Sequence, residues 1–302
     1  MNSSNEKSIC PQCAGNAVRI FVASDLNLHS TRENFSYFRC ESCDVIFLHP
    51  LPPQLDKFYP TDYHAIPRTV ADLKGSLDNE LHKVQLVQKF TSGLRLLEIG
   101  PSFGAFCLLA KETGFNVSAV ELDPECCKFL REAVGIEVYQ EPDVPKFLES
   151  GEKYDAICLW HSLEHLPDPW AVLDRIRGAL RDGGSLFVAT PNPDSFQFRL
   201  FGRYWLHLDA PRHVELIPID VLKARQDRNG FELRHVTTDN RTARLCNEAG
   251  WRVSLNHVFG TAKLNRWTHQ IGLALGSLLS PWECREGRGS AYTAVFRLKS
   301  RP

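Results

Sequence analysis

The stretch Leu96-Leu97-Glu98-Ile99-Gly100-Pro101-Ser102-Phe103-Gly104 decides the fold of this chain. Its apolar residues predict a short buried strand, and its two glycines predict a tight turn that opens a helix. A second acidic strand end follows in Val120-Glu121-Leu122-Asp123, which places Glu121 21 residues after Gly100. That spacing is close to the roughly 20 residues at which a carboxylate accepts hydrogen bonds from ribose hydroxyls in nucleotide-binding folds.

Short apolar runs alternate with helical patterns on both sides of this stretch. Strands are expected at 94–99, 116–120, 154–159, 185–189 and 231–237, and helices at 73–90, 103–113, 124–134, 169–180 and 219–228. This alternation predicts a doubly wound α/β fold, with a mainly parallel sheet covered by helices on both faces. A last strand at 291–298 is expected to form an antiparallel edge of that sheet. Ligands on such sheets bind at the carboxyl ends of the strands.

The glycine turn departs from the dinucleotide pattern G-x-G-x-x-G. Ser102 occupies the position of the second glycine, and Glu98 lies just before the turn. A carboxylate there would repel a pyrophosphate but would attract a ligand that carries an ammonium group. A nicotinamide-dependent oxidoreductase is therefore an alternative that these residues disfavour.

Four cysteines near the amino terminus form two C-x-x-C knuckles, separated by residues 14–39. Each knuckle can direct two sulfurs at one point, and two knuckles complete a tetrahedron around Zn²⁺. Four thiolates leave no open coordination position, so the predicted zinc is structural. Free thiols in a small β domain, or a redox pair, are the alternatives. The predicted ligands are Cys10, Cys13, Cys40 and Cys43.

Four motifs in order carry a family resemblance: E-I-G-x-x-x-G at 98–104, V-E-L-D-P at 120–124, L-E-H-L-x-D-P at 163–169 and L-x-x-G-G-x-L at 180–186. Together they resemble class I S-adenosylmethionine-dependent methyltransferases with a Rossmann-like fold. The subgroup resembled is bacterial, carries an N-terminal cysteine ribbon and includes sugar-modifying enzymes. The resemblance spans roughly residues 10 to 240. A catalytically silent module, whose zinc ribbon contacts a protein or nucleic acid, is a further alternative.

The resemblance implies a set of cofactor-binding residues. Glu98, Gly100 and Gly104 would line the methionine end of S-adenosyl-L-methionine, and Glu121 would hold the ribose hydroxyls. Asp143 would reach the adenine. The whole implied set is Glu98, Gly100, Ser102, Gly104, Glu121, Leu122, Asp143, Trp160 and His161.

A methyl acceptor with a hydroxyl or carbon nucleophile needs a base, and histidine titrates near neutrality. Among His161, His165, His207 and His213, we predict that His165 and His213 are catalytic. Related sugar C-methyltransferases carry tyrosine and glutamate where this chain has Ala210 and Arg212, and an additional C-terminal domain for which this chain is too short. These departures favour O-methylation of a sugar or glycan precursor over C-methylation.

Composition narrows the partners further. The chain has 302 residues, with 35 Lys and Arg against 36 Asp and Glu. The lack of a basic excess argues against nucleic acid and favours a small-molecule substrate. Arg199, Arg203 and Arg212 could bind a phosphate on that substrate, or simply lie on a solvated face. A polar first segment, and no apolar run near the ~18 residues of a membrane span, predict a cytoplasmic protein.

The same patterns divide the chain into a zinc ribbon at 1–48, a linker at 49–72 and a methyltransferase domain at 73–302. The proline-rich linker also holds Phe58, Tyr59, Tyr63 and His64, which are expected to pack more readily than to contact substrate. An apolar helical insertion near 263–282 has tryptophans at both ends. It is expected to pack on the fold, or to contact a second copy, a membrane surface or a lipid-linked substrate.

Overall fold

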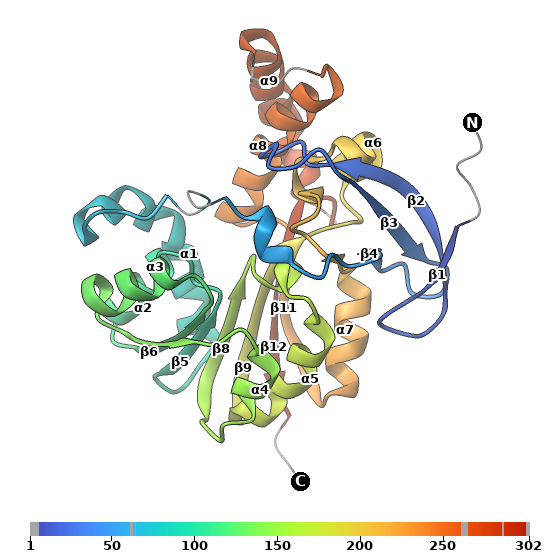
Figure 1. The fold of residues 1–302 in the computed structure, drawn as a ribbon. Helices are drawn as coiled ribbons and strands as arrows, with labels where there is room; N and C mark the ends of the chain where they lie inside the picture. The colour runs from blue at the N-terminus through green and yellow to red at the C-terminus, as the bar shows by residue number, and fades with distance from the viewer. Residues whose placement is uncertain (1–5, 61–62, 64, 261–264, 286, 300–302) are drawn as a thin grey trace.

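A computed structural model of the protein describes residues 6–60, 63, 65–260, 265–285 and 287–299. Its main sheet has seven strands in the order β11-β12-β9-β8-β5-β6-β7. Their bounds are β5 Arg95–Ile99, β6 Asn116–Glu121, β7 Glu137–Gln140, β8 Tyr154–Trp160, β9 Leu180–Pro191, β11 Phe231–Thr237 and β12 Ala291–Leu298. The prediction of an α/β fold with a mainly parallel sheet is confirmed (Figure 1).

Strand direction separates the two halves of this sheet. The pairs β5–β6, β6–β7, β5–β8 and β8–β9 are parallel, whereas β12 runs antiparallel to both β9 and β11. The prediction that residues 291–298 form the edge was wrong. β12 pairs with both β9 and β11, so its backbone groups have partners on both edges, and every residue from Ala291 to Phe296 is buried as in an interior strand covered on both faces.

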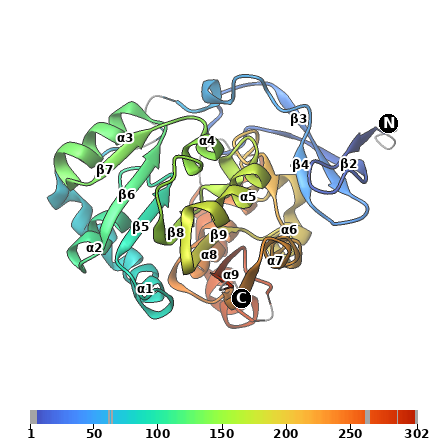
Figure 2. The same ribbon diagram turned by 90° about the horizontal axis from the view of Figure 1, so that it is seen from below.

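Helices cover both faces of the main sheet, as Figure 2 shows from below. α1 (Lys74–Phe90), α2 (Ala105–Glu112) and α3 (Pro124–Phe129) share one apolar core with one sheet face. α4 (Val144–Leu148), α5 (Pro169–Ala179) and α7 (Ile219–Arg228) share a second core with the other face. The predicted helix at 124–134 ends earlier, because its last turn, Leu130–Val134, widens into a π-helix closed by Gly135.

The amino-terminal strands form a second, antiparallel sheet in the order β1-β2-β3-β4-β10. The ribbon region contributes β1 (Lys7–Ile9), β2 (Asn16–Ser24), β3 (Asn34–Cys40) and β4 (Ile46–Leu48). The fifth strand, β10 (Glu215–Leu216), comes from far along the chain and pairs with β4. The ribbon strands are thus joined to the segment that carries His213.

A buried cation reinforces this junction. The guanidinium of Arg212 has no solvent exposure and donates to the carboxylates of Asp25 and Asp209. It also donates to the backbone carbonyl of Phe58, 3.1 Å away. One side chain therefore holds the β2–β3 connection, the linker and the loop before β10 together.

An α-helical pair, α8 (Arg241–Val258) and α9 (Arg266–Glu283), lies between β11 and β12 in the chain. Figure 1 shows α9 at the top of the molecule, beyond α6 (Phe196–Phe201) and away from the main sheet. α9 corresponds to the predicted apolar helix, of which residues 263 and 264 lie outside the described residues. Within the described ranges, no helix combines the length and apolar character needed to cross a bilayer.

Candidate cofactor and acceptor site

The turn after β5 adopts a left-handed backbone at three positions. Gly100, Ser102 and Gly104 have φ of 71°, 54° and 76°. A Cβ on Gly100 would lie 2.7 Å from Cβ of Ser162, and one on Gly104 would lie 2.2 Å from a methyl of Leu130. At both positions glycine is required, because a side chain would be strained by the positive φ and would also collide with its neighbour. Ser102 adopts the same left-handed backbone and is therefore strained.

Glu121 ends β6 directly beside this turn. It is 7% exposed, and its two carboxylate oxygens accept from backbone N–H groups. One oxygen accepts from Ser102 at 3.0 Å, and the other from Leu122 at 2.7 Å and Asp123 at 2.9 Å. The carboxylate thus lies at the carboxyl end of a central strand, where the fold places ligands.

Glu98 lies on β5, one strand away, and is 3% exposed. It accepts a hydrogen bond from the thiol of Cys107 at 2.8 Å. Burial raises the pKa of Glu98 to about 8. A carboxyl in this state gains most from a ligand cation, because a cation stabilises its charged form.

The other predicted cofactor residues lie at neighbouring strand ends. Trp160 ends β8, and His161 follows with φ of 57°. Trp160 Nε1 and His161 Nε2 are buried without a hydrogen-bond partner among the described residues, as expected of groups that meet a ligand. Leu122 is 59% exposed. Asp143 is exposed beyond β7, and its carboxylate accepts from the N–H of Lys146 at 3.0 Å as an α4 cap.

A polar cluster follows β8 and contains both predicted catalytic histidines. The rings of His165 and His213 lie 4.5 Å apart, centroid to centroid, although they are distant in sequence. Nδ1 of His213 donates to the carbonyl of His207 at 2.8 Å, which leaves Nε2 as the acceptor nitrogen. Burial and the charge of His213 lower the pKa of His165 to about 4, so His165 is neutral at pH 7.

Glu164 anchors this cluster, and the sequence analysis assigned it no role. It is 1% exposed and accepts from the hydroxyl of Thr190 at 2.9 Å, while Nδ1 of His161 lies 3.3 Å from its other oxygen. Burial opposes its ionisation, but the contact with His161 and the charges of the histidines lower the pKa of Glu164 to about 2. Ligand atoms of Glu164, His165 and His213 all lie within 4.8 Å of one another.

The linker also reaches this cluster. The hydroxyl of Tyr59 shares a hydrogen bond of 2.9 Å with Nδ1 of His165, and the ring of Tyr63 lies 4.9 Å from that of Tyr59. The aromatic content of the linker was the only sequence signal for this contact; His64 lies outside the described residues. His207 instead donates to the carbonyl of Cys246 at 3.0 Å and lies against Trp205, so it supports the loop.

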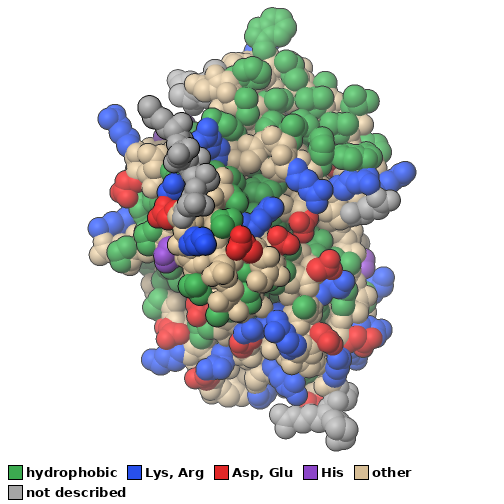
Figure 3. Space-filling model, turned by 90° about the vertical axis from the view of Figure 1, so that its right-hand side faces the viewer, with side chains coloured by type: hydrophobic (Ala, Val, Ile, Leu, Met, Phe, Trp, Pro, Cys, Tyr) green, Lys and Arg blue, Asp and Glu red, His purple; other side chains and the backbone are tan. Residues whose placement is uncertain are grey.

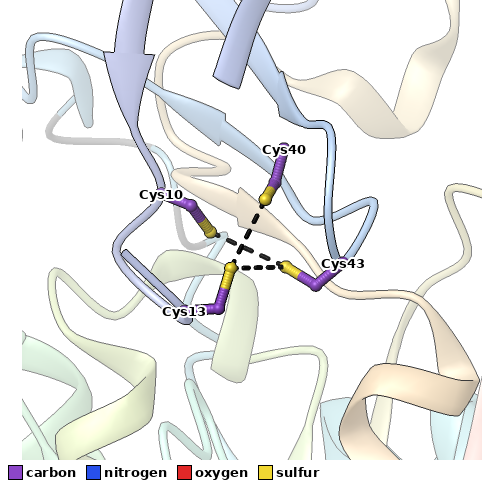
Figure 4. A group of neighbouring side chains, drawn as sticks. All are labelled: Cys10, Cys13, Cys40 and Cys43. Atoms are coloured by element: carbon purple, nitrogen blue, oxygen red, sulfur yellow. Dashed lines mark hydrogen bonds between the residues drawn. The ribbon is translucent and has the colours of Figure 1, made fainter. Parts of the chain in front are cut away.

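The four ribbon cysteines converge, as Figure 4 shows. The sulfurs of Cys10 and Cys43 are 3.7 Å apart, those of Cys13 and Cys40 3.5 Å, and those of Cys13 and Cys43 3.6 Å. Tetrahedral ligation with Zn–S bonds of about 2.3 Å requires sulfurs about 3.8 Å apart. A disulfide requires about 2.05 Å. The donor set therefore fits a zinc ion.

The two knuckles have the same backbone geometry. In each, the first cysteine accepts from the residue that follows the knuckle, Ala14 at 3.0 Å and Asp44 at 3.1 Å. Both of those residues have positive φ, 56° and 61°. Because each turn is built alike, each aims its two sulfurs inward.

A sheet whose strand order reverses between β5 and β8, with a glycine turn and two buried carboxylates at that point, defines a class I methyltransferase. A family model described as "Methyltransferase domain" matches residues 71–236, more than half of the chain. The chain belongs to this methyltransferase family. This match argues against a nicotinamide-dependent oxidoreductase, the first alternative that the sequence left open.

Several curated relatives share one name. A "Ubiquinone biosynthesis O-methyltransferase" of Xylella fastidiosa is 36% identical over 114 residues, which cover 36% of this chain and 46% of the relative. One from Xanthomonas axonopodis pv. citri is 30% identical over 128 residues, which cover 40% of this chain and 54% of the relative. The chain spans about half the length of the curated relatives it matches.

Solved methyltransferases also resemble the chain. A SAM-dependent methyltransferase from Archaeoglobus fulgidus has 19% identity and a TM-score of 0.48, covering 72% of this chain and 94% of that chain. One from Mesorhizobium loti has 18% identity and a TM-score of 0.49, covering 73% of this chain and 99% of that chain.

Proposed function

We propose that this methyltransferase transfers a methyl group to an oxygen of a small-molecule acceptor, with the His165–His213 pair as proton acceptor. The observation that carries the proposal is the meeting of these two rings, 4.5 Å apart, beside the buried carboxylate of Glu164. His165 lies in the segment after β8, and in the same segment Ser162, two residues past the end of the strand, donates to the carbonyl of Ile99 at the start of the glycine turn. Proton acceptor and cofactor turn are therefore neighbours.

The cofactor site we propose lies across the ends of β5, β6 and β8. Glu98 would face the ammonium group of the methionine end, and Glu121 would accept from the ribose hydroxyls. Trp160 and His161 would flank the bound molecule, Leu122 would offer an apolar contact, and Asp143 would reach the adenine from β7. Two buried carboxylates on neighbouring strands, with Nε1 of Trp160 and Nε2 of His161 buried without a partner among the described residues, support this arrangement.

S-adenosylmethionine supplies an electrophilic methyl group on a sulfonium. The protein's own task is then to align the acceptor hydroxyl and to remove its proton. His213 is suited to this because its Nδ1–H is engaged by the carbonyl of His207, which directs the basic Nε2 away from the backbone. His165, neutral and hydrogen-bonded to Tyr59, would orient the same hydroxyl. Glu164 would stabilise the histidines when one of them is protonated.

The names of the relatives and the positions of the arginines bear on the class of methyl acceptor. O-methylation draws support from the name of the relatives, whereas none of the relatives described above is named for a sugar or glycan acceptor. A phosphate on the acceptor cannot engage Arg212, which is buried between two aspartates. Arg199 and Arg203 are exposed and stay available for such a phosphate. If the acceptor is lipid-linked, the apolar helix at 267–282 would contact its lipid part.

We also propose that the four cysteines hold one structural Zn²⁺. The sulfur separations support this, and a closed four-thiolate site offers no position for substrate. The proposed divisions stay at 1–48 for the ribbon, 49–72 for the linker and 73–302 for the methyltransferase domain. The hydroxyl of Tyr37 donates to the carbonyl of His213 at 2.9 Å, so the ribbon would also position the acceptor side.

The test compares His213→Ala and His165→Ala with His235→Ala, a histidine on the edge strand β11. Transfer of radiolabelled methyl is measured against phenols with and without apolar tails and against nucleotide sugars, with S-adenosylhomocysteine binding measured by calorimetry. We expect His213→Ala to lose about 10²–10⁴-fold in turnover, the usual range for a general base, with cofactor binding unchanged. Full turnover in His213→Ala and His165→Ala would refute the proposed roles.

A further inference from the structure

α9 exposes a continuous apolar stripe. Trp267, Ile271, Leu278 and Trp282 are 80%, 48%, 75% and 41% exposed, and Ala274 between them is exposed as well. These positions follow the i, i+4, i+7, i+11, i+15 spacing of one helix face. The stripe is about 22 Å long at 1.5 Å per residue.

The fold covers this face only at its end, where the ring of Trp282 lies 4.7 Å from that of Phe196 and beneath the guanidinium of Arg288. The opposite face of α9 packs closely on α8, where a Cβ on Gly272 would lie 2.6 Å from the Cα of Arg252. Leu275 and Leu279 on that side contact the apolar core shared with Trp251. α9 therefore has one apolar face that holds it in place and a second that stays largely exposed from Trp267 to Leu278.

The end of α8 enlarges the exposed apolar surface. Val258 is 47% exposed and Phe259 is 65% exposed. Figure 3 shows hydrophobic side chains gathered over the top of the molecule, where Figure 1 places α9, with Lys and Arg side chains below them. A contiguous patch rimmed by polar groups marks an interaction surface.

The charged side chains around the apolar stripe indicate which kind of partner it fits. Between residues 265 and 285 the charged side chains are Arg266, Glu283 and Arg285. Glu283 is fully buried and accepts from Gln197 at 3.0 Å and from Trp251 at 3.0 Å. The outward stripe is thus bracketed by two arginines with no exposed carboxylate between them.

A second copy of the chain fits this pattern poorly. In an antiparallel pairing of two stripes, Arg266 would meet Arg285 of the other copy, and in a parallel pairing each arginine would meet its own counterpart. Both arrangements bring like charges together. An anionic lipid surface does the opposite, because each arginine near it gains electrostatic attraction while apolar side chains and terminal tryptophans enter the interface.

We propose that the α8–α9 pair docks the enzyme on an anionic phospholipid surface through the stripe Trp267–Trp282. Docking deepens the proposed function, because it names a lipid surface as the partner of the 267–282 helix. The purpose of docking rests on the proposed methyl transfer, whereas the docking itself does not. The pair is also tied to residues 202–214, the loop that carries His213 and is here called the acceptor loop, since Ser254 Oγ accepts from the N–H of Leu206 at 2.9 Å and His257 donates to the carbonyl of Tyr204 at 3.0 Å. Docking would hold that loop close to an acceptor with an apolar tail.

The test is vesicle flotation of the full zinc-loaded chain with no cofactor or acceptor present. Vesicles of phosphatidylcholine alone are compared with vesicles that also contain phosphatidylglycerol. We expect flotation with the phosphatidylglycerol vesicles, weakened by added salt because the arginine contribution is screened. A double variant, Trp267→Ser with Leu278→Ser, should bind the phosphatidylglycerol vesicles at least about tenfold more weakly than the unaltered chain.

Matched variants separate the possible outcomes. Leu94→Ser alters a leucine that is 61% exposed and lies outside α8 and α9, directly before β5, and it should float like the unaltered chain. Arg266→Gln with Arg285→Gln should lose the preference for phosphatidylglycerol. Failure of the unaltered chain to float would overturn the proposal, as would a dimer that dissociates in the Trp267→Ser, Leu278→Ser variant. Because no methyl transfer is measured, these results are independent of the proposed reaction.

Discussion

Arg212 offers a sharp test of how the ribbon is joined to the rest of the chain. Replacing it by methionine keeps most of the apolar volume but removes the cation between Asp25 and Asp209. The side chains of Arg212 and Asp25 have no solvent exposure, and that of Asp209 is 11% exposed. Removing one partner of a buried ion pair costs about 3–5 kcal/mol, since it leaves uncompensated charge.

The pKa of Asp25 gives a separate estimate of the stability that this ion pair contributes. Burial alone would raise this pKa, but hydrogen bonds from Arg212 and Ser30 lower it to about 2 from the usual 3.8. That difference corresponds to about 2–3 kcal/mol of stability for Asp25 alone. The sign follows from the lowered pKa: the contribution is fully present above about pH 4 and is lost as the pH falls through about 2. We expect the loss of unfolding free energy in Arg212→Met to become smaller towards pH 4–5, because the carboxylates of Asp25 and Asp209, left without their cation, then take up protons.

Urea unfolding at pH 7 and pH 4.5 measures both effects. Arg244→Met is the control, because Arg244 and Asp239 form an ion pair whose side chains are 61% and 43% exposed. Exposed pairs contribute about 0–1 kcal/mol. If Arg212→Met cost no more than Arg244→Met at pH 7, the claim that this cation holds the ribbon to the acceptor loop would fail.

Three further predictions concern the cofactor and the metal. Glu121→Ala should weaken S-adenosylhomocysteine binding by about 1.5–3 kcal/mol, measured by calorimetry with Glu121→Gln for comparison, and unchanged affinity would place the ribose elsewhere. Because the raised pKa of Glu98 keeps this carboxyl mostly protonated below pH 8, binding should tighten by up to about tenfold per pH unit between pH 6 and 8. Glu98→Gln should remove that dependence; a pH profile identical to that of the unaltered chain would exclude Glu98 as the ammonium partner. Elemental analysis should find about one zinc per chain and none in Cys40→Ser, whereas an ordered ribbon without metal would contradict the proposed ligation.

Much of the main sheet and the cofactor turn could be predicted from local sequence. Glu98, Gly100, Gly104 and Glu121 lie within two consecutive strand–turn units, so their spacing alone implies that they meet at adjacent strand ends. The two cysteine knuckles are equally local, because each is one turn long. The helix at 219–228 and the strands at 231–237 and 291–298 likewise have the predicted bounds, since capping and apolar runs act over a few residues.

The arrangement of these parts was decided only by tertiary structure. No local pattern pairs β4 with β10, places Arg212 between Asp25 and Asp209, or brings Tyr59 to His165. These contacts join segments that are remote in the chain, and they form because buried charges and strand edges must find partners wherever the fold supplies them. The sequence by itself thus determined the methyltransferase sheet, its glycine turn and the two cysteine knuckles. The tertiary structure decided that the ribbon, the linker and the loop before β10 meet at the His165–His213 cluster, because satisfying buried polar groups is a property of the whole packed chain.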